Sequence, residues 1–475
     1  MNARRIAIAG GGITGLAAAH RILEVARRRS LPVEVALFEA SHRLGGVISS
    51  FRRDGFLLEE GPDSIITDKP WARELAERLG IGERLVGTQD RYRRSFVVRR
   101  GRMRPTPDGF YLLAPSMLVP LAASTIFSPL GKARMALDLI IPRRTSPADE
   151  SIGSFVTRRL GREALERMAQ PMVAGIYGAD PHALSLQATF PRFRQMETEH
   201  GSVIRAMWAA RRRPSAGAAP APGSARSSGA RYGLFVSFDA GLQVLTDTLA
   251  GVLPEGLART GTPVSSIAQV PPARWSLTVG DRVEEFDAVI LALRAHQAAT
   301  LVRRVDEKLA DRLASIPYTS AVTVSLAFPE AAIAHPLDGF GFVVPTIEKL
   351  SMLGCTFCHR KYASRSPDRH ALVRAFCGES VYRDSDEEII ARVLGDLRRL
   401  LGIRGEPSLT HLARWPRSMP QYMVGHLDLV SEIENRVATH HGLALAGNAY
   451  RGIGVPDCVH SGEKAAEAII ARMFS

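Results

Sequence analysis

A glycine-rich turn near the start of the chain constrains the fold more than any other feature. An apolar segment, Arg5–Ala9, is followed directly by the pattern G-x-G-x-x-G at Gly10–Gly15, and apolar residues at helical spacing continue to Arg29. A second apolar segment, Val33–Phe38, ends at Glu39. In this order of strand, turn, helix, strand and acid, the glycines permit a tight turn and the close approach of a pyrophosphate, which the helix N-terminus binds. The segment therefore predicts a dinucleotide-binding βαβ unit.

The acid at the end of the second strand restricts the nucleotide. A carboxylate at Glu39 would accept hydrogen bonds from ribose hydroxyls, and its charge would repel the 2′-phosphate of NADP. NAD and FAD both remain compatible with this part of the chain. The residues expected to bind the phosphates and the ribose are Gly10, Gly11, Gly12, Ile13, Thr14, Gly15 and Glu39.

The residues after Glu39 resemble those of the FAD-binding flavoprotein oxidases, a group that includes amine oxidases, phytoene desaturases and protoporphyrinogen oxidases. Glu39 begins the pattern E-x-x-x-R-x-G-G, and a later segment contains a Gly-Pro pair. In that group the arginine and the glycine pair line the diphosphate, and the later segment lies along the flavin. The resemblance implies FAD as the cofactor and adds as expected contacts Arg43, Gly45, Gly46, Val47, Gly61, Pro62, Asp63 and Ser64.

Length and charge limit the class of protein. The chain has 475 residues, which is too many for one hydrophobic core and enough for two or three domains. Its 61 Lys and Arg residues against 48 Asp and Glu residues give a net charge of +13. Only 6 of the 61 basic residues are lysines, a skew that GC-rich coding alone explains. The functional alternative is attraction to an anionic membrane surface or an anionic substrate. Nucleic acid is not expected, because no recognition motif and no basic stripe interleaved with aromatic residues is present.

The cysteines and the apolar segments indicate the compartment. Four cysteines in a chain of this length predict a reducing compartment and no disulfide framework. The segment Cys355–His359 matches the C-x-x-C-H site of c-type haem, but such attachment occurs outside the cytoplasm, and no signal peptide precedes Arg4. No second cysteine pair is available for a zinc site, so no metal is expected. Prolines in the longest apolar segment, Phe110–Pro129, would break a membrane-spanning helix. We therefore expect a cytoplasmic protein, at most peripheral on the inner face of the cell membrane.

Strand and helix patterns along the chain predict an α/β fold, α+β overall, with a discontinuous Rossmann-like FAD-binding domain, a β-sheet substrate domain and an inserted all-helical domain. Strands at 262–267 and 275–279 are expected to rejoin the N-terminal sheet, and β-rich runs between 321 and 414 predict one broad second sheet. The expected parts are the FAD-binding domain (1–90, 231–300 and 426–475), a substrate-domain hairpin (91–109), the helical, membrane-facing domain (110–213), a low-complexity, disordered loop (214–230) and the substrate domain (301–425).

Several later segments resemble one family within that group, the protoporphyrinogen and coproporphyrinogen oxidases of haem biosynthesis. The segments are Pro171–Asp180, Asp239–Gln243, Gly339–Gly341, Pro420–His426 and Gly447–Cys458, and the resemblance spans nearly the whole chain. It implies a six-electron oxidation of a porphyrinogen by FAD, with O2 reduced to H2O2 and with possible handover of the porphyrin to ferrochelatase. The protein would supply a flat apolar slot, orientation and charges for the propionates.

The same resemblance implies roles for individual residues. Gly175 would present its backbone carbonyl near the macrocycle, as the catalytic position. The apolar slot would be formed by Phe340, Val343, Thr356 and Phe376. Further flavin contacts would come from Val264, Trp415, Gly447, Asn448 and Val455.

One departure from the family leaves the substrate open. Many protoporphyrinogen oxidases carry an arginine just before the aromatic residue of the hairpin at 91–105, where this chain has Ser95 before Phe96, with Arg93 and Arg94 beside it. Serine resembles the coproporphyrinogen-oxidising branch, so Arg93 and Arg94 are candidates to bind either two or four propionates. The competing interpretations are an FAD-dependent amine oxidase or desaturase, which would often need a lysine at the flavin, and a flavin-binding membrane-surface protein without turnover.

Overall fold

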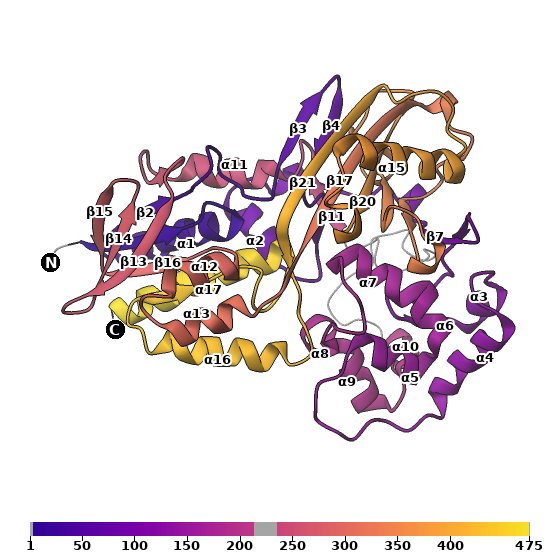
Figure 1. Ribbon diagram of the computed structural model, residues 1–475, viewed down its shortest axis with the longest axis horizontal. Helices are drawn as coiled ribbons and strands as arrows, with labels where there is room; N and C mark the ends of the chain where they lie inside the picture. Colours follow the sequence, from indigo (N-terminus) through magenta and orange to yellow (C-terminus); the bar gives the residue numbers. More distant parts are fainter. Residues whose placement is uncertain (1–2, 213–234, 475) are drawn as a thin grey trace.

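The computed structural model describes residues 3–212 and 235–474 (Figure 1). A five-stranded parallel sheet with the strand order β12-β2-β1-β16-β22 organises one half of the molecule. Its strands are apolar at successive positions because both faces are covered. In β1, for example, Ile6 and Ile8 face one hydrophobic core and Ala7 and Ala9 face the other. The strands are β1 (Arg4–Ala9), β2 (Val33–Phe38), β12 (Ala258–Arg259), β16 (Ala288–Leu291) and β22 (Leu443–Leu445).

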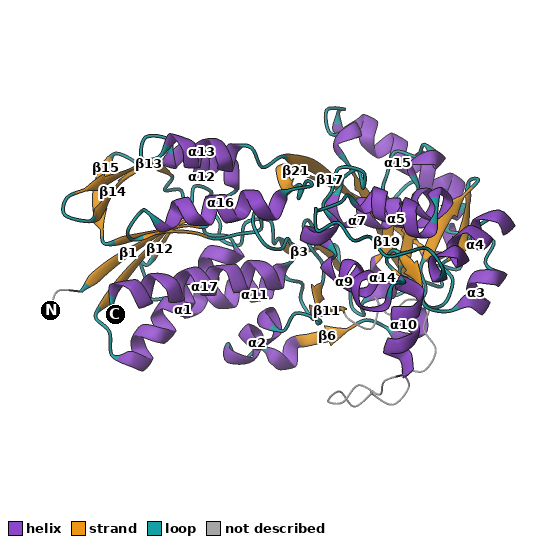
Figure 2. Ribbon diagram, turned by 90° about the horizontal axis from the view of Figure 1, so that it is seen from below, coloured by secondary structure: helices purple, strands orange, loops and turns teal. Residues whose placement is uncertain are grey.

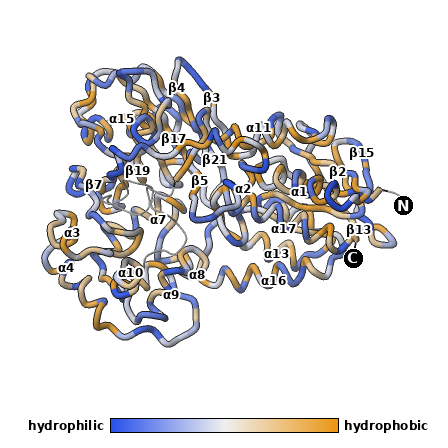
Figure 3. The backbone as a smooth tube through the Cα atoms, turned by 180° about the vertical axis from the view of Figure 1, so that it is seen from behind, coloured by the Kyte–Doolittle hydropathy of each residue, from blue (hydrophilic) through white to orange (hydrophobic). Residues whose placement is uncertain are grey.

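Helices cover both faces of this sheet. Those on one face include α1 and α17, and those on the opposite face include α12 and α16 (Figure 2). Hydrophobic and hydrophilic residues alternate along these helices, as expected for helices that bury one side (Figure 3). The predicted Rossmann-like α/β arrangement is therefore confirmed. The helices are α1 (Ile13–Arg29), α2 (Trp71–Arg78) and α11 (Gln243–Val252) with α17 (Val455–Met473), and α12 (Ala295–Val302), α13 (Glu307–Ala314) and α16 (His426–Ala438).

The prediction that the strands at 262–267 and 275–279 rejoin the parallel sheet is wrong. They form a separate antiparallel sheet, β13-β14-β15, packed on one face of the parallel sheet. The reason is visible in β14, where Trp275, Leu277 and Val279 are buried and the residues between them are only half-buried, the alternation of a sheet covered on one side. A strand at 235–238 likewise pairs with two short strands outside the parallel sheet. These strands are β13 (Val264–Val270), β14 (Arg274–Val279), β15 (Arg282–Phe286), β5 (Ile65–Ile66), β6 (Leu85–Gly87) and β11 (Phe235–Phe238).

A seven-stranded sheet with the order β21-β17-β20-β19-β18-β7-β8 forms the second half. The predicted hairpin is present as β7 and β8, and β7 adds to the sheet in parallel with β18. Helix α15 (Asp386–Leu401) buries Ile389, Val393 and Leu397 against one face of the sheet. The strands are β7 (Phe96–Arg99), β8 (Arg102–Pro105), β17 (Tyr318–Pro329), β18 (Gly341–Val343), β19 (Gly354–Phe357), β20 (His370–Cys377) and β21 (Leu409–Pro420), and a hairpin, β3 (Ser50–Arg53) and β4 (Phe56–Glu59), stands beside them (Figure 1).

Helices dominate residues 110–212, although two short paired strands, β9 (Phe110–Tyr111) and β10 (Ala114–Pro115), interrupt the predicted all-helical pattern. The predicted loop 214–230 lies outside the described residues. Among the residues that the structure describes, no helix combines the length and the apolar character needed to cross a membrane. The helices are α3 (Leu118–Ala123), α4 (Pro129–Ala136), α5 (Ile152–Leu160), α6 (Arg162–Ala164), α7 (Gln170–Tyr177), α8 (Leu186–Thr189), α9 (Pro191–His200) and α10 (Val203–Arg212).

Candidate functional site

The glycine-rich turn is packed so tightly that side chains are excluded from it. A Cβ atom at Gly15 would overlap the carbonyl oxygen of Gly10, and Gly10 has a φ of +106°. A Cβ at Gly12, in contrast, would meet only the Cα of Gly46, at 3.9 Å. Helix α1 begins after Gly12 without a side-chain cap, so its first N–H groups are available to a ligand. Open space beside uncapped N–H groups suits a pyrophosphate. Ile13 and Thr14, which were also predicted to bind the cofactor, are the first two residues of this helix.

Glu39 is held in place at the end of β2. Its carboxylate accepts hydrogen bonds from the N–H groups of Gly11 at 2.7 Å and Ser41 at 2.8 Å. Its backbone carbonyl accepts a hydrogen bond from the N–H of Thr262 at 2.8 Å. This contact brings β13, and with it the half-buried Val264, to the same edge of the sheet.

Arg43 folds the next loop over the turn. Its guanidinium donates hydrogen bonds to the carbonyls of Ile48 at 3.0 Å and Gly46 at 2.5 Å. The N–H of Gly45 in turn donates to the carbonyl of Gly11 at 2.9 Å. The loop that contains Val47 is thus fixed against the phosphate-binding turn by the residues that the sequence singled out.

The segment from Gly61 to Ser64 continues from this loop. A Cβ at Gly61 would overlap the carbonyl oxygen of Val47, so only glycine permits the two segments to pack. Trp415, on β21, donates its indole N–H to the carbonyl of Glu60 at 2.8 Å. Trp415 therefore acts on the segment through the backbone, and Pro62 follows at a half-buried position.

Charged side chains hold the same segment from the second sheet. Asp63 forms ion pairs with Lys361 at 2.8 Å and with Arg374 at 3.3 Å. Burial alone would raise the pKa of Asp63, but Lys361 and Arg374 outweigh it and hold the pKa of this carboxyl well below its usual range. Tyr362 donates a hydrogen bond to the hydroxyl of Ser64 at 2.9 Å.

Residues 447–455, in the C-terminal part of the chain, include the last of the predicted cofactor contacts. The N–H of Gly447 donates to the hydroxyl of Ser461 at 2.9 Å. The hydroxyl of Tyr422 donates to the carbonyl of Asn448 at 2.6 Å and accepts from the N–H of Gly452 at 2.8 Å. Val455 then begins α17, whose N-terminus is a second positive dipole end. These features fit FAD. The turn is open at Gly12 and Gly46, the carboxylate of Glu39 is held where it could bind a ribose, and two helix N-termini are present.

Three of the predicted slot residues lie together on one face of the seven-stranded sheet. Val343 pairs with Gly354, and Gly354 pairs with Phe376 on the next strand. Thr356 stands two residues from Gly354, and so on the same face. All three side chains are half-buried, and the glycine between Val343 and Phe376 leaves the face flat. Such a face suits a flat apolar ligand.

Gly175 lies opposite this face, on α7. It is exposed although both its preceding neighbours are buried, and a Cβ there would meet only Val343, at 3.9 Å. Val343 and Ile453, the latter from the C-terminal loop, each pack against the core of the helical region. Residues of all three structural regions therefore contribute to this one core.

The remaining predicted substrate residues lie just before two strands of the seven-stranded sheet, Phe340 before β18 and Arg93 and Arg94 before β7. Phe340 is 3% exposed, and its N–H donates to the carbonyl of Arg94 at 2.8 Å. The Arg94 guanidinium is paired with Asp338 at 2.6 Å, and that of Arg93 with Asp90 at 2.7 Å. The backbone of Arg94 is thus bonded to the residue before β18, while its side chain is half-exposed and paired with an acid.

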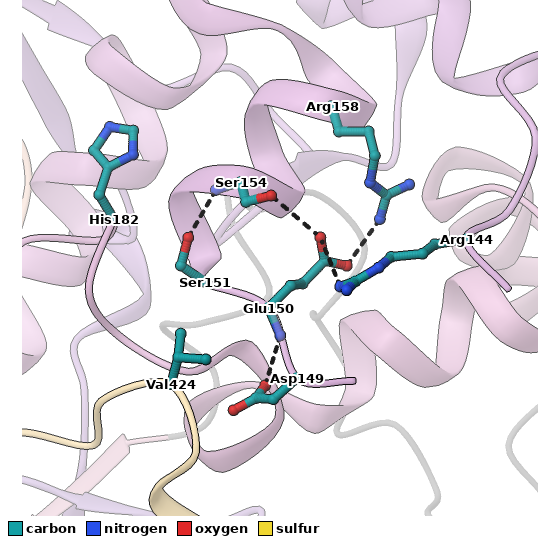
Figure 4. A pocket seen from close by; sticks show the side chains of 8 residues that line it. All are labelled: Arg144, Asp149, Glu150, Ser151, Ser154, Arg158, His182 and Val424. Carbon is teal, nitrogen blue, oxygen red and sulfur yellow. Dashed lines mark hydrogen bonds and ion pairs between the residues drawn. The ribbon is translucent and has the colours of Figure 1, made fainter. Parts of the chain in front are cut away.

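A cavity of about 470 Å³ lies elsewhere, between the start of α5 and residues 424–425 (Figure 4). Glu150 binds Arg158 at 2.9 Å and Arg144 at 3.4 Å, and Asp149 accepts a hydrogen bond from the N–H of Gly425 at 3.1 Å. Because Glu150 pairs with two arginines of the helical region and Asp149 binds the backbone of Gly425, we interpret this region as the joint between the helical region and the segment that carries Tyr422. Its lining is Arg144, Asp149, Glu150, Ser151, Ser154, Arg158, His182 and Val424.

Sequence analysis did not identify Lys361, Arg374 or Tyr422. Arg374 could have been found, because in a strand it shares a face with Phe376, two residues later. Lys361 follows the C-x-x-C-H pattern within the short helix α14 (Cys358–Lys361), and no local pattern connects it to Asp63. The competing amine oxidase interpretation would often need a lysine at the flavin, and Lys361 is instead paired with the carboxylate of Asp63.

The molecule combines a parallel sheet that carries a glycine-rich turn with a flat apolar face on its second sheet. This combination is that of a flavin-dependent oxidoreductase with FAD as its cofactor. The chain belongs to the family of flavin-containing amine oxidoreductases, whose family model matches residues 13–470, and within it to the protoporphyrinogen and coproporphyrinogen oxidases.

The similarity to individual relatives covers nearly the whole chain. The chain is 33% identical to the coproporphyrinogen III oxidase of Bacillus subtilis over 99% of both chains. It is 27% identical to protoporphyrinogen oxidase 2 of Arabidopsis thaliana over 100% of this chain and 95% of the relative. A solved structure from Exiguobacterium sp. 255-15, provisionally assigned as a protoporphyrinogen oxidase, superposes with a TM-score of 0.86 at 31% identity, over 99% of each chain.

Proposed function

We propose that the chain is an oxygen-dependent oxidase that converts a porphyrinogen to the porphyrin in haem biosynthesis, with coproporphyrinogen III as its preferred substrate. The full-length identity to relatives of that name carries the proposal. The coproporphyrinogen III oxidases of Bacillus subtilis and Staphylococcus aureus are 33% and 32% identical to this chain, whereas the Arabidopsis thaliana protoporphyrinogen oxidase 2 is 27% identical.

FAD, when bound, supplies the acceptor for three two-electron oxidations and passes the electrons to three O2 molecules, giving three H2O2. The chain contributes the geometry. In this proposal the macrocycle lies against Val343, Thr356 and Phe376, and Gly175 permits its close approach because it has no side chain. Half-buried apolar residues also exclude water from the slot. No acid–base residue is required, because the cofactor performs the difficult step.

The propionates of the substrate are charged and need cationic partners at the rim of the slot. We assign this role to Arg94, whose backbone is bonded to Phe340, and to Arg93 beside it. Binding would exchange the surface contact of Arg94 with Asp338 for a charge-assisted pair with a propionate.

Porphyrin fluorescence, measured with coproporphyrinogen III and protoporphyrinogen IX as parallel substrates, tests the function. We expect a fluorescence increase with both, a higher kcat/KM for coproporphyrinogen III, and one H2O2 per O2 consumed. Oxidation of primary amines without any porphyrin formation would instead support the amine oxidase interpretation.

We also propose that the protein is cytoplasmic and binds the membrane surface through α3 and α4, at the end of the molecule opposite the termini (Figure 1). Val119, Leu130 and Ile140 are 81%, 83% and 74% exposed there. The guanidinium of Arg99 bonds to the carbonyl of Thr125, so the basic β7–β8 turn flanks these apolar residues, which favours anionic lipid.

A doubly substituted chain, Leu130→Glu with Ile140→Glu, should no longer sediment with anionic vesicles. Equal sedimentation of both chains would contradict the proposed surface.

Handover of the porphyrin to ferrochelatase is a further proposal, motivated by the tendency of flat aromatic macrocycles to stack and aggregate in water. Metal insertion in the coupled reaction should then be insensitive to an added porphyrin-scavenging protein. Complete inhibition by the scavenger would show release into solution.

A further inference from the structure

A buried cluster of charges lies where the segment Gly61–Ser64 meets the seven-stranded sheet. The side chains of Lys361, Asp63 and Arg374 are only 13%, 15% and 2% exposed, and Asp63 is bound to both cations, at 2.8 Å and 3.3 Å. Arg374 also donates to the carbonyls of Glu59 at 2.6 Å and Gly61 at 3.0 Å. Charges this far from water are weakly screened, so their sum influences whatever binds beside them.

The cluster carries more positive than negative charge. Lys361 and Arg374 contribute two cations against the single carboxylate of Asp63. The next carboxyl group, Glu59, lies 3.8 Å from the equally buried Arg365. Burial raises the pKa of Glu59, although hydrogen bonding to Ser50 and the charge of Arg365 act in the opposite direction. If Glu59 is ionised, its charge is matched by that of Arg365; if it is protonated, Arg365 adds a further positive charge. In either state, this pair leaves the excess positive charge of the cluster in place.

The position of the cluster connects the cofactor site with the slot. Asp63 follows Gly61, which packs on Val47 in the loop over the phosphate-binding turn. On the other side, the guanidinium of Arg374 lies 4.7 Å from the centre of the Phe376 ring, in the slot face. A cofactor that extends from the phosphate turn along Gly61–Ser64 toward the slot passes directly beside this charge.

We propose that Lys361 is a positioning residue that sets the redox balance of the flavin: with Arg374 it surrounds Asp63 so that a net positive charge faces the cofactor and stabilises its electron-rich, reduced form. The inference rests on the proposed function, because it requires FAD along Gly61–Ser64. Two-electron reduction of a flavin at neutral pH adds negative charge to its pyrimidine ring. A fixed cation nearby therefore binds the reduced cofactor more tightly than the oxidised one.

The magnitude follows from Coulomb's law. One unit charge at roughly 10 Å from another, at an effective dielectric constant of about 20, changes an equilibrium by on the order of tenfold. For a two-electron couple this factor corresponds to about 30 mV in the reduction potential.

Charge substitutions with opposite signs test the proposal. Lys361→Met removes a cation and should lower the ratio of reduced to oxidised FAD affinity about tenfold, shifting the potential about 30 mV more negative. Asp63→Asn removes the anion and should shift the potential by a similar amount in the positive direction. Lys361→Arg keeps the charge, and Lys349→Met, at an exposed position in the same sheet domain, removes a distant one. Both should stay within about twofold of wild type.

The measurements are the dissociation constant of oxidised FAD and the spectroelectrochemical potential of the bound flavin in the full chain. Shifts of the same sign in Lys361→Met and Asp63→Asn would overturn the proposal, since a loosened loop predicts no reversal of sign. Unchanged potentials with FAD retained would overturn it as well. If Lys361→Met does not fold, Asp63→Asn against Lys361→Arg still decides the sign. A wild-type chain that binds no FAD would instead refute the proposed function.

Discussion

Removing one hydroxyl group, by Tyr422→Phe, should weaken both the fold and FAD binding. The side chain of Tyr422 is 1% exposed, and its hydroxyl joins the carbonyl of Asn448 to the N–H of Gly452. Burial raises the pKa of this phenol well above its usual value, so the hydroxyl remains a hydrogen-bond donor at any working pH. The substitution leaves a half-buried carbonyl and a half-buried N–H without this partner.

Leaving a buried polar group unsatisfied costs about 1–3 kcal/mol. Because water can reach both half-buried groups in part, we expect Tyr422→Phe to lower the free energy of unfolding by about 1–3 kcal/mol in total. Because Asn448 and Val455 frame the proposed cofactor site, part of this loss should appear as a weaker affinity for FAD, by roughly tenfold for each 1.4 kcal/mol.

Tyr450→Phe is the matched control. Tyr450 is also buried and lies in the same segment, but its hydroxyl has no hydrogen-bond partner among the described residues. Its removal should be neutral or slightly stabilising, because no bond is lost. Urea unfolding and FAD fluorescence titration of both variants measure the two quantities. Equal effects of Tyr422→Phe and Tyr450→Phe would refute the reasoning, because the hydroxyl bridge would then contribute nothing.

Three further outcomes are expected. Gly15→Val should abolish FAD binding, because its Cβ would overlap a backbone carbonyl that cannot move away; a yellow, FAD-loaded variant would contradict this. Arg94→Ala should raise KM for coproporphyrinogen III more than for protoporphyrinogen IX. The expected loss of binding free energy is about 1.5–3 kcal/mol. Equal changes of KM for the two substrates in steady-state assays would show that Arg94 does not bind a propionate. Burial lowers the pKa of His359 to about 4, despite a backbone hydrogen bond with Leu372, so the unfolded chain binds more protons between pH 6.5 and 4 and the folded protein should lose stability as pH falls through that window. His359→Gln should flatten this loss in urea titrations at several pH values, and an unchanged pH profile would argue against a buried neutral histidine.

Local patterns predicted the elements whose burial is determined by their own residues. The apolar strands around Gly10–Gly15 and the hairpin ending at Pro105 are present where the sequence placed them. The sheet partner of a strand was harder to predict, because β14 and β16 are both rich in apolar residues. Only alternation distinguishes them: β14 is covered on one side, and β16 on both.

The site shows the same division. The glycines of the cofactor site are recognisable because close backbone packing leaves no alternative residue, as at Gly61. The neighbours of Asp63 are not recognisable, because Lys361 and Arg374 lie about 300 residues away in the sequence and meet it only through the fold, as their ion pairs show. A charge cluster formed by residues far apart in the sequence therefore cannot be predicted from a local pattern. A glycine required by close packing can be, because the glycine is itself part of the local pattern.

The arrangement of the parallel sheet has a consequence for synthesis of the protein. The glycine-rich turn leaves the ribosome long before β22 and α17, which carry the C-terminal part of the proposed cofactor site and begin about 430 and 440 residues after Gly15. At typical synthesis rates the interval is roughly tens of seconds. During that time the nascent chain exposes the face of α1 that α17 covers, and after residues 288–291 have been made it also exposes the edge of β16 that pairs with β22. We therefore expect cofactor loading to follow the synthesis of α17, and the half-built domain to be a substrate for chaperones.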